Sequence, residues 1–124
     1  MNQKNIFSVI AALLVLQGIG FFLMKGTIVT SSFPALDEAG HSAAVKLIAV
    51  IAALSIMIGL IAYAARSATN VVWAFAIGSA ILGAVTIKHR FTDGVNVPVG
   101  VMVVQLFIIM ACFYLWGQKE AVIK

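Results

Sequence analysis

The chain has few charged side chains and few of the groups with which enzymes carry out chemistry. Of its 124 residues 10% are charged, with four acidic residues against eight Lys or Arg. Soluble domains carry about 25% charged residues, so this composition does not supply a water-compatible surface. The single cysteine, Cys112, excludes an intramolecular disulfide and a C-x-x-C dithiol site. Soluble classes of protein are therefore poor candidates.

What the chain has in excess is apolar sequence, at 63% hydrophobic residues, gathered into four long runs. The only charged residue inside these runs is Lys46. The runs cover residues 6–24, 43–65, 71–87 and 98–116. A helix needs about 20 apolar residues to cross a ~30 Å hydrocarbon layer, so each run predicts a membrane-spanning helix. We expect an all-α fold: a single-domain integral membrane four-helix bundle with short loops over residues 1–124.

The first loop is the longest and carries signals typical of a helix start. Ser31 and Ser32 can cap a helix, Pro34 suits a first turn, and Asp37 and Glu38 favour a helix N-terminus. These residues predict a short interfacial helix between the first and second spans.

Small residues recur every three or four positions in two of the spans. The second span has Ala52, Ser55, Gly59 and Ala62, and the third has Ala76, Ala80 and Ala84 with Ser79 and Gly83. Helices in a bilayer associate by close packing of small residues. Since residues 67–70 form a very short connection, we expect spans two and three to be antiparallel neighbours in a close hairpin.

Two glutamines lie within the spans. Gln17 and Gln105 fall at similar depths of the first and fourth spans, which run in opposite directions. Polar groups inside a membrane segment find partners, so we expect a hydrogen bond between them or a polar ligand that they share. The simpler interpretation is an ordinary helix-to-helix hydrogen bond of about 0.6 kcal/mol.

Most of the ionisable groups are predicted at the membrane face that holds the first and third loops. The candidate ligand-binding residues there are His41, Lys46, His89 and Arg90, in addition to the two glutamines. One interpretation is a polar mouth that recognises a lipid headgroup, a quinone carbonyl or an anion. The other is snorkelling of Lys46 to the headgroups, with Asp37 or Glu38 as its partner.

Catalytic and cofactor chemistry find little support in the sequence. Apart from Lys46, the spans contain no group that serves as an acid or base, and neither G-x-S-x-G nor H-E-x-x-H occurs. His41 precedes the second span and His89 ends the third, without carboxylates at metal-ligand spacing. The basic residues are scattered rather than gathered on one face, which argues against nucleic acid. We expect no catalytic residue, no metal and no cofactor.

The second span is similar to the second helix of the DoxX-like small membrane proteins. It runs from Lys46-Leu47-Ile48-Ala49 through Gly59-Leu60-Ile61-Ala62 to Ala65-Arg66, although Lys46 stands where the resemblance leads one to expect arginine. The long first loop and the aromatic end at residues 113–116 are also similar. The resemblance implies a four-helix bundle without chemistry of its own, in a family that includes accessory subunits of membrane redox assemblies.

Two functions follow as expectations. The first is a non-catalytic accessory or scaffold subunit of a larger membrane complex, with another membrane protein or a second copy as partner. The alternative is binding or transport of a lipid, quinone or other hydrophobic molecule through a polar-mouthed cavity. Basic residues tie at four on each side of the membrane. The free N-terminal amine then favours cytoplasmic termini, in a bacterial inner membrane.

Overall fold

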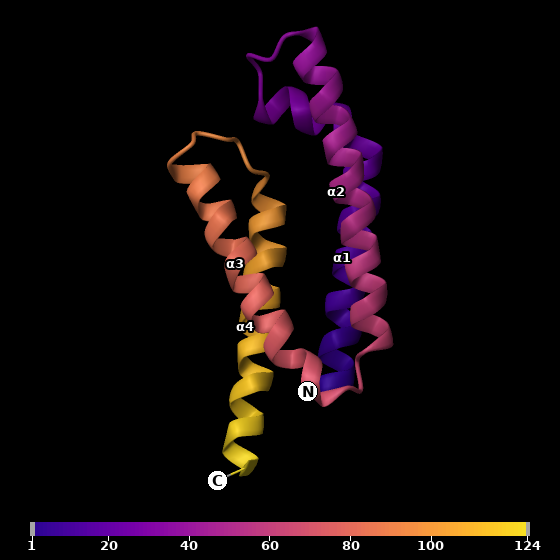
Figure 1. The fold of residues 1–124 in the computed structure, drawn as a ribbon, viewed down its shortest axis with the longest axis vertical. Coiled ribbons are helices and arrows are strands. Elements are labelled where there is room, and N and C mark those ends of the chain that lie inside the picture. Colours follow the sequence, from indigo (N-terminus) through magenta and orange to yellow (C-terminus); the bar gives the residue numbers. More distant parts are fainter. Residues whose placement is uncertain (1, 124) are drawn as a thin grey trace. The chain divides into compact units, whose positions relative to one another are not determined.

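The computed structural model describes residues 2–123 as an almost entirely helical chain (Figure 1). Helices make up 85% of the chain, and no strand occurs among residues 2–123. The elements are α1 (Gln3–Ser32), α2 (Glu38–Ala64), the 3₁₀ turn η1 (Thr69–Val71), α3 (Val72–Phe91) and α4 (Val99–Ile123). The prediction of an all-α fold with four main helices is confirmed.

All four helices are long and apolar enough to cross a membrane. The shortest, α3, has 20 residues, which corresponds to about 30 Å and matches the hydrocarbon thickness. Large apolar side chains lie on outward faces: Leu16 is 65% exposed, Leu23 76% and Ile81 61%. Apolar surface of this extent suits lipid or other apolar helices rather than water.

The first loop is shorter than predicted, because α1 continues through the polar residues after its apolar run and ends at Ser32. Only residues 33–37 are non-helical there, so the expected interfacial helix is absent from the described chain. Asp37 instead caps α2: its Oδ1 accepts the Gly40 backbone N–H at 2.7 Å, and its carbonyl accepts that of His41 at 2.8 Å. The acidic start signal is therefore real, but it begins α2.

The chain divides into two compact units. The first holds residues 8–64, where α1 and α2 lie side by side as an antiparallel hairpin (Figure 1). The second combines the start of α1, up to Phe7, with the described residues from Ala65 onward. Its α3 and α4 form another hairpin. The grouping of all four spans into one bundle stays a prediction.

Close contact between α1 and α2 depends on glycine. A Cβ added at Gly18 would lie 2.6 Å from the Ala52 carbonyl oxygen, and one at Gly59 would lie 2.9 Å from the Ala11 carbonyl oxygen. Ser55 Oγ donates to the Leu14 carbonyl at 2.9 Å. The small-residue stripe of α2 is buried as expected, and these contacts are with α1. The expected hairpin of the second and third spans joins the two units and stays a prediction. Small residues favour close approach without selecting the partner.

The second unit is held together at both ends of its hairpin. At one end the Phe7 ring packs edge-on against Phe75, with centroids 5.3 Å apart. There Gln3 Nε2 also donates to the carbonyls of Arg66 and Ala68 at 3.3 and 2.8 Å. At the other end the loop between α3 and α4 turns at Gly94, whose φ of +69° favours glycine. An Asp-Gly pair, here Asp93-Gly94, is a common turn sequence.

Candidate functional site

The six candidate residues fall into the two units. Residues 8–64 contain Gln17, His41 and Lys46, and the α3–α4 hairpin contains His89, Arg90 and Gln105. Each set is described within its own unit. The predicted hydrogen bond between Gln17 and Gln105 joins the two units, and it stays a prediction.

His41, at the start of α2, contacts a residue near the end of α1. Its Nε2 lies 3.1 Å from Thr30 Oγ1, and that hydroxyl donates its proton to the Gly26 carbonyl at 3.0 Å. Which of the two groups donates in this contact depends on the tautomer of the His41 ring. This contact joins the two helices across the first loop. Sequence reasoning did not identify Thr30 as the residue that His41 contacts.

Lys46 lies on an exposed part of α2, and Gln17 is half-buried in α1. The ion pairs found within residues 2–123 do not include Lys46. The expected pairing with Asp37 or Glu38 is not among these ion pairs, and Asp37 Oδ1 accepts the Gly40 backbone N–H. An exposed lysine at a span end suits extension toward the headgroups.

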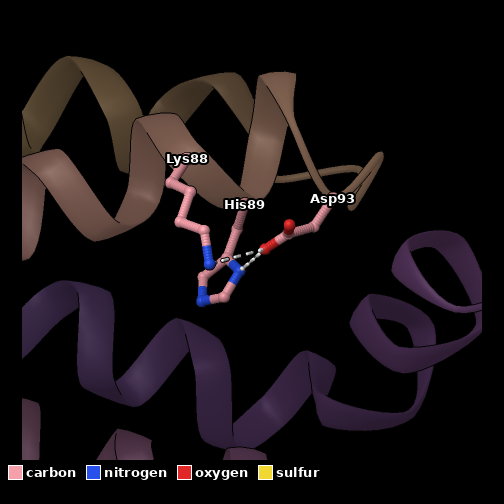
Figure 2. Close-up of polar contacts among 3 residues, drawn as sticks. All are labelled: Lys88, His89 and Asp93. Atoms are coloured by element: carbon pink, nitrogen blue, oxygen red, sulfur yellow. Dashed lines mark hydrogen bonds and ion pairs between the residues drawn. The ribbon is translucent and has the colours of Figure 1, made fainter.

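The end of α3 carries a small ionic cluster formed by Lys88, His89 and Asp93 (Figure 2). His89 Nδ1 lies 2.6 Å from Asp93 Oδ2, and Lys88 Nζ lies 3.9 Å from the same oxygen. The backbone N–H groups of Thr92 and Asp93 donate to the Lys88 carbonyl at 2.8 and 3.2 Å. The cluster thus lies where α3 ends, and its basic members suit the negative end of the helix dipole.

Arg90 is half-buried and faces a different partner. Its Nη1 donates to Asn96 Oδ1 at 2.5 Å, within the loop that leads to α4. No carboxylate in residues 2–123 forms an ion pair with it. Four residues earlier on α3 is Thr86, one helical turn away on the same side of the helix. Sequence reasoning identified Arg90 but not Asn96 or Thr86.

Gln105 is the most deeply buried of the candidates, at 8% exposed. Its Oε1 lies 2.9 Å from Thr86 Oγ1, which is also 2.9 Å from the Leu82 carbonyl oxygen. The single hydroxyl proton is shared between these two acceptors. The Gln105 Nε2 has no hydrogen-bond partner. The unpaired atom is the donor Nε2 in this orientation of the amide, and it would be the acceptor Oε1 if the amide were turned by 180°.

These residues are suited to recognition. The α3–α4 hairpin offers a guanidinium without a carboxylate partner and a buried amide with one unused donor. No group of three or more His, Cys, Asp or Glu able to hold a metal is found in the part of the chain that the structure describes. The chemistry available is hydrogen bonding and charge pairing.

Comparison of the chain with protein-family models, with curated proteins and with solved structures gives no match. The resemblance to the DoxX-like proteins stays a prediction from the residues quoted above.

Proposed function

We propose that this chain is a non-catalytic multi-pass membrane protein that serves as an accessory or scaffold subunit of a larger membrane complex. The observation that supports it is the exposed apolar surface: at most 28% of the residues in the apolar window of any helix are buried within the chain. Such surface is available to lipid tails and to the helices of a partner. The proposed setting is a bacterial inner membrane, with both termini in the cytoplasm.

Native mass spectrometry of the tagged chain, released from its own membrane in a mild detergent, tests this proposal. We expect a second protein, or further copies of the chain, at fixed stoichiometry. The same preparation in a harsh detergent provides the control, because it removes partners held by helix packing. A lone chain in both detergents would contradict the proposal.

A second candidate function is binding of a lipid, quinone or other hydrophobic molecule. It is favoured by the unpaired Nε2 of Gln105, a buried donor on a hairpin that otherwise exposes apolar residues. A buried amide group without a partner costs about 1–3 kcal/mol, which a ligand acceptor would recover. Small molecules retained in the same mass spectra test this function, and spectra free of any retained lipid or quinone would oppose it.

A further inference from the structure

We propose that the loop end of the α3–α4 hairpin binds an anionic phospholipid, with the phosphate on Arg90 and a glycerol ester carbonyl on Gln105. This inference rests on the second proposed function, binding of a hydrophobic molecule, and it names the class of ligand. Three features of the hairpin support it: the free donors of Arg90, the unpaired amide of Gln105 and the register between them.

Arg90 supplies the anion-binding group. The one carboxylate of this loop, Asp93, is already within reach of both Lys88 and His89, while Arg90 contacts the neutral amide of Asn96. A guanidinium has five N–H donors in a planar fork that matches phosphate oxygens. Arg90 uses one of them on Asn96, and its half-buried position limits its contact with water. An anionic group placed there would compensate its charge.

The local charge balance favours an anionic headgroup over a zwitterionic one. The loop end carries two permanent cations, Lys88 and Arg90, against the single carboxylate of Asp93. A zwitterionic headgroup would bring a further cation into this basic environment. Basic side chains at a membrane surface attract anionic lipids by about 1 kcal/mol for each Lys or Arg.

Gln105 supplies the second contact, one turn deeper in the hairpin. Thr86 precedes Arg90 by four residues, about 6 Å along the helix axis, and Thr86 contacts Gln105. In a phospholipid the ester carbonyls also lie just below the phosphate, on the side of the acyl chains. Nε2 is itself covered by neighbouring side chains, and once these move aside an ester carbonyl would accept its unpaired proton. The acyl chains would then continue over exposed side chains such as Ile87 and Leu106.

The test is titration of the purified chain with phosphatidylglycerol or phosphatidylcholine, with bound lipid counted by native mass spectrometry. We expect phosphatidylglycerol to bind more tightly. Arg90→Gln should weaken it about tenfold, as loss of a charge-assisted hydrogen bond does. Gln105→Met, close in size but without the amide, should weaken it about threefold. Arg90→Lys should retain the preference for the anionic lipid.

Lys46→Gln is the matched control, because Lys46 is an exposed basic residue of the other unit. It should weaken binding of phosphatidylglycerol less than Arg90→Gln does, because it removes only the general attraction between an exposed lysine and an anionic lipid. Thermal unfolding of every variant in the same detergent establishes that it is folded. If Gln105→Met does not fold, the comparison of Arg90→Gln with Lys46→Gln still tests whether binding of phosphatidylglycerol depends on Arg90.

Three outcomes would overturn the inference. They are equal binding of the two lipids, equal loss in Arg90→Gln and Lys46→Gln, and Arg90-dependent binding of inorganic phosphate alone. The last would assign the site to a soluble anion. A quinone or zwitterionic lipid that binds without dependence on Arg90 would remove only this inference. Absence of any bound amphiphile would remove the second proposed function as well.

Discussion

At the scale of single residues, Asp37 has a role that its charge alone does not indicate. Its carboxylate accepts the Gly40 N–H at the third position of α2, and an aspartate or asparagine in this place satisfies a backbone donor that the helix leaves free. The residue lies at the base of the first loop, where α2 begins. Its contribution is therefore to the start of α2.

Replacing Asp37 with alanine should destabilise the protein by about 1 kcal/mol, because the N-cap hydrogen bond is lost. Asp37→Asn should leave stability nearly unchanged, since asparagine caps equally well. Unfolding in detergent measures the stability, and hydrogen exchange at the Gly40 amide measures the cap directly. Equal exchange at Gly40 in the parent and in Asp37→Ala would contradict the assigned role.

The ionic cluster at the end of α3 should contribute much less to the stability of the fold than its short interatomic distances suggest. The side chains of Lys88 and His89 are 66% and 48% exposed, and exposed ion pairs contribute about 0–1 kcal/mol. Asp93→Asn should therefore change the free energy of unfolding by less than about 1 kcal/mol, as measured by denaturant titration. A larger loss would mean that Asp93 organises the loop between α3 and α4.

Residue-scale prediction from the sequence was uneven. Gln105 could be identified because a glutamine is rare within an apolar run, and burial supports that choice. Its contact Thr86 could not, because threonine is common in such runs and its hydroxyl is often satisfied by its own helix, as it is here by Leu82. His41 was assigned to a polar mouth because it lies among the ionisable groups predicted at one membrane face. Its contact with Thr30 could not be predicted, because Thr30 comes from another helix and such contacts depend on the packing.

At the scale of the helices, Gly18 and Gly20 of α1 allow a controlled comparison of the same substitution at a packed and at an open position. A Cβ at Gly18 would lie 2.6 Å from the Ala52 carbonyl oxygen, whereas one at Gly20 would meet nothing within 4 Å. Gly18→Ala should destabilise the α1–α2 hairpin by about 1–3 kcal/mol through overpacking. Gly20→Ala should be neutral or slightly stabilising, because alanine is the better helix former.

Unfolding in detergent measures both variants, and the sign of the difference is the informative result. Similar effects of the two substitutions would mean that α1 and α2 do not approach closely at Gly18. Gly83 supplies an intermediate case, because the atom nearest its added Cβ is the mobile end of the Ile109 side chain, at 2.8 Å. Gly83→Ala should therefore cost less than Gly18→Ala.

The helices themselves could be predicted from the apolar runs, but their ends and partners could not. The run in the first span stops at Met24, while α1 continues to Ser32, and the Thr30 hydroxyl in this extension bonds to the Gly26 carbonyl of the same helix. Hydropathy measures how strongly a side chain prefers apolar surroundings to water, whereas a helix ends where its backbone hydrogen bonds end. The partner of the α2 stripe likewise depends on Gly18, a residue that helix spacing alone does not distinguish.

At the scale of the whole molecule, four membrane-spanning helices would place both ends of the described chain on one side of the membrane. With cytoplasmic termini, a fluorescent protein fused to the C-terminus should fluoresce in a bacterial host, and alkaline phosphatase fused there should be inactive. Phosphatase inserted at Gly94, in the loop between α3 and α4, should be active. The reverse pattern would invert the proposed orientation.

The membership of α1 in both units has a consequence for the order in which contacts form during synthesis. From Ser8 onward α1 packs with α2, its immediate successor along the chain, so this hairpin can close before α3 is made. The first turn is different, because Gln3 bonds to the carbonyls of Arg66 and Ala68 and Phe7 packs against Phe75. The first turns of α1 therefore complete their contacts only after α3 has begun to form, although they precede both α2 and α3 in the chain.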